Sequence, residues 1–205
     1  ALWMRCVGRL AFPIFCFLIA EGCAHTRDKK RYAARLLGFA VLSEPAFDLM
    51  CGGVWFTMDY QNVLWTLLLG ALVCWVVDWA QTGAALWQRL PAEAAIAVGF
   101  LLAHWLNTDY GGWGVVTVAL LQLCRDGKYA KLWLLLAMAA VNGLGMGSLM
   151  MPVFGGEMPI QIFAVAALPV IWLYNGQAGP KGLRRAFYVF YPAHLLVLEG
   201  IRTLT

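Results

Sequence analysis

The sequence predicts an all-α fold, a polytopic transmembrane helical bundle of about eight membrane segments, in a single domain over residues 1–205. The 205 residues are 62% hydrophobic and 13% charged, with a mean hydropathy of +0.71, far more apolar than a soluble domain. Eight apolar runs alternate with short polar loops, and lipid admits only structures, such as helices, that satisfy their own backbone groups. Lys and Arg occur in every second loop, a bias that orients multi-pass membrane proteins with their basic loops in the cytoplasm.

The expected membrane segments are runs that approach the roughly 20 residues a helix needs to cross the hydrocarbon core. They are residues 5–24, 34–56, 62–77, 92–106, 113–124, 132–154, 160–175 and 186–204. Pro13, Pro45 and Pro169 fall inside these segments and predict kinks, because proline lacks a backbone N–H. In the sixth segment, Gly143 and Gly147 have a spacing that permits close helix contact, within the bundle or between copies.

Four basic loops contain twelve of the fifteen Lys and Arg residues, and they alternate with three loops, residues 53–61, 107–112 and 154–158, that contain none. The twelve are Arg27, Lys29, Lys30, Arg31, Arg35, Arg89, Arg125, Lys128, Lys131, Lys181, Arg184 and Arg185. With the basic loops in the cytoplasm, the first segment runs inward and the C-terminus lies outside. Since a bacterial chain normally starts in the cytoplasm, we expect one further helix upstream, so that the domain is N-terminally truncated.

Composition also excludes several classes of partner and cofactor. The net charge of +4 gives no argument for nucleic acid, because the positive side chains lie in the inward loops, and the lipid bilayer is the partner we expect. The six cysteines show no metal-ligand spacing and are expected as small core residues, so no metal site is predicted. No P-loop or dinucleotide fingerprint is present, which excludes a soluble-type nucleotide-binding fold.

Ionisable residues at membrane depth are costly, so each is a candidate for function or for a buried pair. Arg9 lies near the outer end of the first segment, and Glu44 and Asp48 lie on one face of the second. If these segments form an antiparallel hairpin, Arg9 and Asp48 reach a similar depth near the outer surface. Two compatible interpretations follow: an Arg9–Asp48 ion pair, or charged groups that line a polar cavity opening outward.

Three further polar residues belong to the same outer half. Asn62 stands at the outer mouth of the third segment. Asp109 stands in the hairpin over residues 107–114, whose glycines could by themselves explain the run as a tight turn. His194 lies in the middle of the last segment, where it is either a hydrogen-bonded packing residue or a base that exchanges a proton near neutral pH.

Basic residues gather on the inner side of the predicted bundle. Those that we single out are Arg27, Lys30, Arg31, Lys181 and Arg184. Each loop alone is explained by cytoplasmic retention and attraction to anionic lipid. Together, these side chains could also bind a polyphosphate, because Lys and Arg neutralise phosphate oxygens well.

Short runs along nearly the whole chain are similar to those of one family. The first is Arg5-Cys-Val-Gly-Arg-Leu-Ala-Phe-Pro-Ile-Phe and the last is Tyr191-Pro-Ala-His-Leu. Between them lie residues 21–22, 25–27, 43–45, 47–48, 61–63, 66–70, 109–111, 114–115 and 173–176. In this order they resemble the TraX family, named for the conjugal-transfer protein linked to N-terminal acetylation of pilin.

The TraX family looks like a branch of the polytopic membrane acyltransferases, which include acyltransferase type 3 and the lysosomal glucosaminide acetyltransferase. The resemblance implies a bacterial inner-membrane enzyme that takes acetyl-CoA as co-substrate from the cytoplasm. The acceptor would be an amine or hydroxyl of a pilin, a glycan or a lipid. Members usually have an earlier helix ending in an acidic–histidine pair, and this histidine is the favoured base in the wider superfamily. The chain begins after that position, so His194 would be a secondary member of the site.

The sequence therefore predicts a membrane-embedded acetyltransferase that works by direct transfer, with a histidine accepting the proton of the acceptor. The residues expected to line the outer site are His194, Arg9, Asp48, Asp109 and Asn62. The residues expected to bind the phosphates of CoA are Arg27, Lys30, Arg31, Lys181 and Arg184.

Two rival functions use the same residues differently. A small-solute secondary transporter would use Arg9, Glu44, Asp48 and His194 as a substrate or proton relay. A non-catalytic subunit of a conjugation or secretion machine would perform no chemistry. Labelled acetyl-CoA distinguishes the enzyme from both rivals, and solute uptake into proteoliposomes identifies the transporter.

Overall fold

The structure is a computed structural model that describes residues 2–83, 87, 89–146, 149–153, 156–177 and 183–204. Its α-helices are α1 (Leu2–Gly8), α2 (Ala11–His25), α3 (Lys29–Gly52), α4 (Val63–Gln81), α5 (Arg89–Trp105), α6 (Gly111–Leu123), α7 (Ala130–Ala140), α8 (Leu168–Trp172) and α9 (Leu183–Leu204). A π-helix, η2 (Val141–Gly145), extends α7, and a 3-10 helix, η3 (Ile160–Ala167), precedes α8. The chain is thus mainly helical, as predicted.

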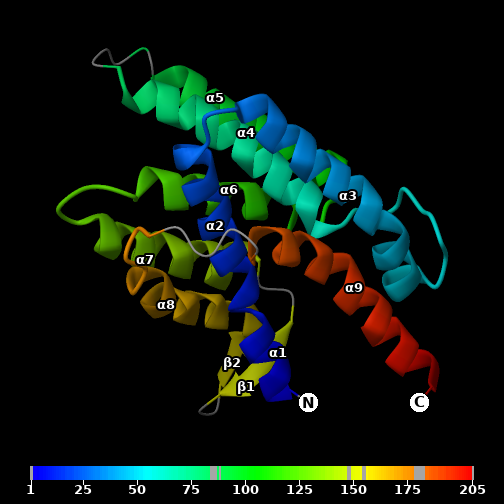
Figure 1. Cartoon of the computed structure of the whole chain (residues 1–205). Coiled ribbons are helices and arrows are strands. Elements are labelled where there is room, and N and C mark those ends of the chain that lie inside the picture. Colours follow the sequence, from blue (N-terminus) through cyan, green and yellow to red (C-terminus); the bar gives the residue numbers. More distant parts are fainter. Residues whose placement is uncertain are drawn as a thin grey trace.

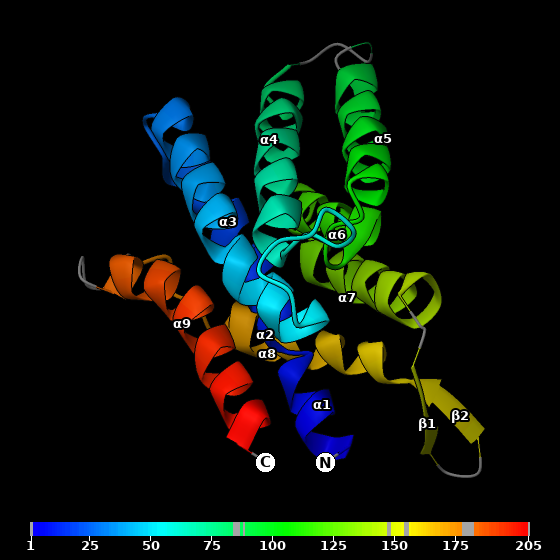
Figure 2. The same ribbon diagram turned by 90° about the vertical axis from the view of Figure 1, so that its right-hand side faces the viewer.

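Helix α2 crosses the middle of the molecule and packs against α4 and α6 (Figure 1). Helices α4, α5 and α6 pack against one another, and α4 also contacts α3. Figure 2 shows α4 and α5 side by side as a hairpin, with α9 lying along α3. The largest buried apolar cluster joins α2, α3, α4 and α6 and includes Phe12, Cys16, Leu36, Leu67 and Val118.

The first expected segment is interrupted between α1 and α2. The break falls at Arg9 and Leu10, four and three residues before Pro13. Proline has no N–H to bond to the carbonyl four residues earlier and its ring crowds that carbonyl, so a continuous helix through Arg9 is disfavoured. The amide of Arg9 instead bonds to the carbonyls of Arg5 and Cys6, each at 3.2 Å. The kink predicted from Pro13 is therefore a complete change of helix.

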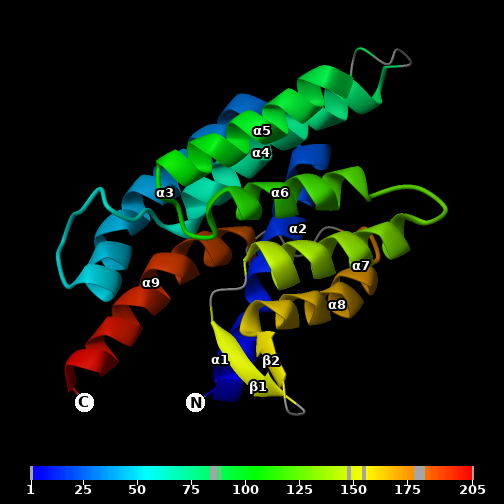
Figure 3. The same cartoon turned by 180° about the vertical axis from the view of Figure 1, so that it is seen from behind.

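The prediction of a sixth helix over residues 132–154 is wrong for the second half of this range. After η2 the chain forms two antiparallel strands, β1 (Met150–Val153) and β2 (Gly156–Pro159), with Met150 opposite Pro159. Glycine and proline explain the difference, because Gly143 and Gly145 weaken the helix and Pro152 offers no amide to extend it. The predicted all-α fold is therefore corrected: the described chain also contains a β-hairpin, which lies near the N-terminus (Figure 3). Gly147 lies outside the described residues.

Two stretches of the described chain are long and apolar enough to cross a membrane, Met4–His25 and Val63–Gln81. Gly111–Leu123, Ala130–Gly145 and Ile160–Trp172 are apolar but shorter. The expectation of about eight crossings is thus not confirmed by helix length. Of these two stretches, Val63–Gln81 is the single helix α4, whereas Met4–His25 spans α1 and α2.

The two kinds of connection lie at different ends of the molecule. The turns after α2 and α6, which are basic, lie toward the upper and left-hand side of Figure 1. The segment between α3 and α4 and the C-terminal end of α9 lie to the right of the same view. A bridge between Gln61 and Thr108 places the α5–α6 connection beside the α3–α4 segment. Among the described connections, the basic turns after α2 and α6 therefore lie apart from the α3–α4 segment, which has no Lys or Arg.

Candidate functional site

Buried polar side chains gather where the end of α3 meets the start of α4, and Asn62 lies at their centre. Asn62 is fully buried, and its Oδ1 accepts a hydrogen bond from the Leu64 amide at 2.9 Å, which caps α4. Its Nδ2 donates to the Ala40 carbonyl at 2.8 Å, and its backbone amide donates to Glu44 Oε1 at 3.2 Å. Asn62 thereby fixes the crossing of α3 and α4.

Glu44 and Asp48 follow each other on the buried face of α3, with 5% and 1% of their surfaces exposed. Trp65 Nε1 donates to Glu44 Oε1, and the Thr57 amide donates to Asp48 Oδ2 at 2.9 Å. The other two carboxylate oxygens, Glu44 Oε2 and Asp48 Oδ1, are buried without a hydrogen-bond partner among the described residues. Buried polar atoms are normally satisfied, so these two oxygens indicate a place for a proton, water or a donor group of a ligand.

Asp109 belongs to the same cluster through the bridge between the α3–α4 segment and the α5–α6 connection. The Gln61 amide donates to the Asn107 carbonyl at 3.0 Å, and the Asp109 amide donates to the Gln61 carbonyl at 2.8 Å. The Asp109 side chain then accepts from the Tyr60 hydroxyl at 2.7 Å and from the Tyr110 amide at 3.1 Å. Asp48, Asn62 and Asp109, which the sequence predicts as site residues, therefore lie in one connected region.

Arg9 also lies in this region, but not where we expected it. Within the described residues no ion pair joins Arg9 to Asp48, so that prediction is wrong. Arg9 lies near Asp109 and Tyr110, and its positive charge lowers the pKa of both groups against the larger, opposite effect of burial. Arg9 and Asp48 were expected at a similar depth on the assumption that one continuous helix includes Arg9, whereas the helix breaks before Pro13.

The glycine-rich turn over residues 107–114 has a packing role as well as a local one. Gly111 has a φ of +49°, as a tight turn requires, and Tyr110 has a φ of 63°, which is unusual for an aromatic residue. The Tyr110 ring stacks on Phe12 of α2, with 3.6 Å between ring centroids and 6° between planes. This stack attaches the turn that holds Asp109 to the central helix.

Replacing Asp109 by asparagine is expected to raise the midpoint temperature of unfolding at pH 7 and to have a smaller effect near pH 4. Burial raises the pKa of Asp109 above its ordinary value of 3.8, because it disfavours the charged form. Asp109 therefore contributes its whole stabilising effect when the pH is below its ordinary pKa of 3.8. This contribution is lost as the pH rises through the pKa of Asp109 in the folded protein. Asparagine removes this penalty and still accepts from Tyr60.

The pH effect is measured by thermal unfolding of purified protein at the two pH values. The exposed Glu157→Gln on β2 is the matched control and is expected to change neither midpoint. A lower midpoint for Asp109→Asn at pH 7 would mean that ionised Asp109 stabilises the fold.

His194 lies on α9 at the margin of the cluster. Its Nδ1 is 3.1 Å from the Phe190 carbonyl oxygen, and its ring stacks on Phe190 with 5.0 Å between centroids. A carbonyl oxygen can only accept, so in this contact Nδ1 is the donor and Nε2 points to no hydrogen-bond partner among the described residues. Among the described residues, no hydrogen bond or ion pair joins His194 to Arg9, Asp48, Asn62 or Asp109.

Tyr191 links His194 to the cluster and was not predicted as a site residue. Its ring lies 5.4 Å from that of His194, and its hydroxyl interacts with the backbone amide of Val63, near Glu44 and Asp109. The sequence could have indicated Tyr191, because it stands three residues before His194 and residues with this spacing share a helix face.

The predicted basic site on the opposite side is less well defined. Arg27 is exposed on the turn between α2 and α3, and Lys30 and Arg31 are exposed at the start of α3, which Asp28 caps; Asp28 also pairs with Arg31 at 3.4 Å. Lys181 and the side chain of Arg184 lie outside the described residues.

A cavity of about 490 Å³ opens on that side instead, between α2, the α6–α7 turn, α7 and α8. Its ionisable lining includes Arg125, Lys131 and His25 together with the carboxylates of Glu21 and Asp126, whereas Arg27, Lys30 and Arg31 do not line it. The sequence placed Arg125 and Lys131 in a basic loop but gave no reason to choose them as ligands. In the described chain no three His, Cys, Asp or Glu side chains come together as a metal site requires.

Comparison with known proteins identifies the family of the chain. The chain is 29% identical over 206 residues to "Probable fimbrial assembly protein FimC, serogroup H1" of Dichelobacter nodosus, covering 95% of this chain and 81% of that protein. No solved structure matches the chain. A family model described as TraX protein matches residues 1–202. A match over nearly the whole length confirms the likeness that the short runs indicated, and the chain therefore belongs to the TraX family.

Proposed function

We propose that this protein is a membrane-embedded acetyltransferase that moves an acetyl group from cytoplasmic acetyl-CoA to an amine or hydroxyl on the other side of the inner membrane. One observation supports this proposal above the others. Helix α2 joins the cavity that Arg125 and Lys131 line, to which it contributes Glu21 and His25, to the polar cluster, which it meets through the Phe12–Tyr110 stack. A donor and an acceptor could thus approach one helix from opposite ends.

Apolar surface supports placement in the bilayer. Besides the two long apolar stretches, α5 and α9 expose large side chains such as Leu101, Trp105, Val197 and Ile201, each more than half exposed. Patches of this kind on a soluble monomer would favour aggregation, whereas lipid would cover them. We propose that the basic turns face the cytoplasm and that the polar cluster faces outward.

The separation of the two ends suits the donor. Nine residues of α2 separate Phe12 from Glu21, which corresponds to about 14 Å along a helix. An extended pantetheine arm would bridge a distance of this order and bring the thioester from the basic side toward the cluster.

The proposed chemistry is direct transfer, and His194 and Tyr191 would take part in it. The amine nitrogen or hydroxyl oxygen of the acceptor would attack the thioester carbonyl carbon while His194 Nε2 accepts the acceptor's proton. The Tyr191 hydroxyl would donate to the oxyanion that forms. When the C–S bond breaks, the CoA thiolate would receive the proton from His194, so that acetyl-acceptor and free CoA result. Asn62, Asp48 and Arg9 would shape and charge the site.

The acceptor that we propose first is a pilus subunit. The relative in Dichelobacter nodosus is named a probable fimbrial assembly protein, which favours a substrate in pilus assembly over a surface glycan or a lipid. A free amino terminus of such a subunit would present the amine.

The unpartnered oxygens of Glu44 and Asp48 favour one alternative, a transporter that binds a proton or a cationic solute there. Both ideas are tested on purified protein given acetyl-labelled CoA and a peptide with a free amino terminus. The proposal expects labelled peptide and free CoA in equal amounts. Uptake of solute by proteoliposomes without acetyl chemistry would support the transporter and refute the enzyme.

A further inference from the structure

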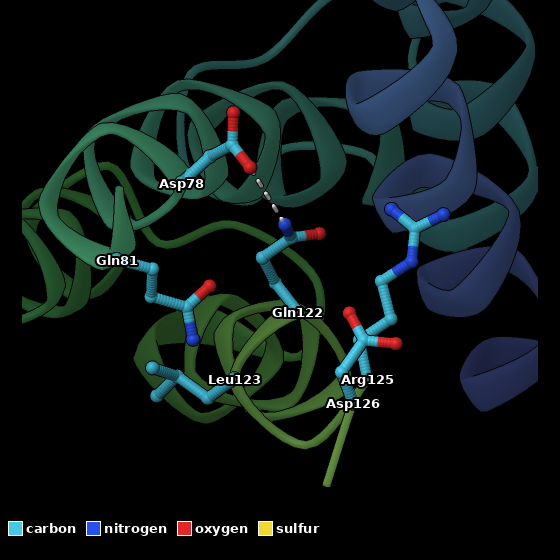
Figure 4. Close-up of a pocket in the computed structure, with 6 residues that line it drawn as sticks. All are labelled: Asp78, Gln81, Gln122, Leu123, Arg125 and Asp126. Carbon is cyan, nitrogen blue, oxygen red and sulfur yellow. Dashed lines mark hydrogen bonds between the residues drawn. The ribbon is translucent and has the colours of Figure 1, made fainter. Parts of the chain in front are cut away.

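The C-terminal ends of two helices meet on the basic side of the molecule and enclose a cavity. Helices α4 and α6 pack against each other, and they end at Gln81 and Leu123. The cavity between these ends has a volume of about 370 Å³, in the range of small-molecule sites. Figure 4 shows the residues that line it, which are Asp78, Gln81, Gln122, Leu123, Arg125 and Asp126.

The two helix ends give this cavity a negative electrostatic character. The last four carbonyl groups of an α-helix have no partner within the helix, and the helix dipole places partial negative charge there. Lys, Arg or His often offsets this charge, but the last turns of α4 and α6 contain none. Asp78 stands in the last turn of α4 and Asp126 shortly after the end of α6, so two carboxylates add to the negative charge. A cation would be stabilised here and an anion repelled.

The positive charge in the lining does not balance these carboxylates. Within the described part of the chain, neither Asp78 nor Asp126 forms an ion pair. Arg125 lines the cavity, but its Nη2 lies 3.2 Å from Oε1 of Glu21, which does not line it. Glu21 thus offsets the charge of Arg125, and the two aspartates keep a net negative charge in the cavity.

Gln122 provides independent evidence for a ligand. It is only 3% exposed and yet lines the cavity, and its Oε1 is buried without a hydrogen-bond partner among the described residues. Its Nε2 donates to Asp78 Oδ1 over a long 3.5 Å, and Figure 4 shows the side chain reaching from α6 toward Asp78. Because buried polar atoms are normally satisfied, the unpartnered oxygen predicts a ligand group that donates a hydrogen bond.

We propose that this cavity binds a primary ammonium group, carried by a free amine or by the headgroup of an aminophospholipid. Such a group has one positive charge and three N–H donors, as the side chain of lysine does. The carboxylates of Asp78 and Asp126 and the Oε1 of Gln122 offer three acceptors, two of them charged. A quaternary ammonium has the charge but no N–H, so it would leave Gln122 Oε1 unsatisfied. The cavity therefore selects for N–H donors as well as for positive charge.

The test uses the purified full chain in nanodiscs of phosphatidylcholine, whose headgroup has no N–H. In one arm, calorimetry measures binding of 1,4-diaminobutane and of its fully N-methylated analogue, which keeps both charges. In the other arm, phosphatidylethanolamine is added to the nanodiscs, and native mass spectrometry measures which lipid the protein retains. Preference for diaminobutane over its analogue would identify a free amine as the ligand, and selective retention of phosphatidylethanolamine would identify the headgroup. We expect the primary ammonium to be preferred in at least one arm.

Substitutions in the lining test the charge and the hydrogen bonds separately. Asp78→Asn is expected to weaken binding about 10-fold or more, since a charge-assisted hydrogen bond is lost. Gln122→Leu is expected to weaken it about 5-fold, the effect of one neutral hydrogen bond. Arg125→Gln is expected to strengthen binding about 3-fold, because it removes a positive charge from the lining. The direction of this last change distinguishes a cation site from an anion site.

Two further variants separate local effects from general ones. Glu93→Gln removes the same charge as Asp78→Asn from an exposed position on α5, outside this lining, and is expected to bind as the wild type does. Asp126→Asn, in the exposed turn after α6, provides a second test of charge should Asp78→Asn fail to fold. It is also expected to weaken binding about 10-fold.

Several results would contradict an ammonium site. Equal binding of the primary and methylated amines, together with equal retention of the two lipids, would exclude recognition of N–H donors. Unchanged binding in both Asp78→Asn and Asp126→Asn, or weaker binding in Arg125→Gln, would exclude recognition of the charge by these residues. Absence of binding by the wild type in both arms would refute the site altogether. Acetyl transfer does not depend on this cavity, so none of these results would refute the proposed function.

Discussion

Replacing His194 by alanine is expected to lower the rate of acetyl transfer about 100-fold or more, because a positioned acid–base group typically contributes at least this factor. The hydrogen bond from Nδ1 to the Phe190 carbonyl leaves Nε2 free to accept a proton. The side chain is only half-buried and its ring contacts lie within α9, so membrane insertion and thermal stability should change little. The measurement is turnover of labelled acetyl-CoA by purified wild type and variant, with insertion checked by fractionation.

The exposed His104 on α5 provides the matched control, and His104→Ala is expected to retain wild-type turnover. Tyr191→Phe is expected to reduce turnover less than His194→Ala does, because it removes one donor and keeps the ring contact. Full activity in His194→Ala would show that this histidine is not part of the site. The other residues of the cluster would then be replaced one at a time.

Replacing Asn62 by alanine is expected to lower the free energy of unfolding by about 1–3 kcal/mol, which combines a lost helix cap with a lost buried hydrogen bond. The variant leaves the Leu64 amide without its acceptor and the Ala40 carbonyl without one donor. Asn62→Ser restores the cap and is expected to recover part of the loss. The measurement is the midpoint of thermal or denaturant unfolding in detergent.

Asn175→Ala is the control for this stability effect. Asn175 is exposed after α8, and its Oδ1 accepts only from the nearby Gln177 amide at 3.0 Å. Its replacement should change stability by less than about 0.5 kcal/mol, as is usual for surface positions. Equal effects at Asn62 and Asn175 would show that the α3–α4 crossing does not depend on the Asn62 side chain.

Local chemistry explains which parts of the fold the sequence could predict. Alternation of basic and non-basic loops depends only on charge and chain order, and the structure separates the two kinds of connection in space. The course of the first segment was harder to predict, since Pro13 can either kink or end a helix. Residues 150–153 were expected to end the sixth helix because they are apolar, whereas glycine and proline nearby permit a β-hairpin.

The candidate site likewise has some features that local sequence predicts and others that it does not. Asp48, Asn62 and Asp109 lie in one region of the structure, and each stands at or near a helix terminus whose position the apolar runs define. The predicted partner of Arg9 was wrong, since Arg9 stands in the break between α1 and α2 and not within a continuous helix. Arg125 and Glu21 come from elements about a hundred residues apart in the sequence, and only the folded chain brings them within 3.2 Å.

The most direct test of the central claim is transfer across a membrane. Protein is reconstituted in vesicles and its orientation is determined with an impermeant maleimide at the exposed Cys51, which lies at the end of α3 beside the polar cluster. Labelled acetyl-CoA is supplied only to the compartment that faces the basic turns, and a peptide with a free amino terminus only to the other. We predict labelled peptide in that arrangement and none when the two compartments are exchanged. Acetylation only when both substrates share one compartment, or none in any arrangement, would contradict transfer through the bundle.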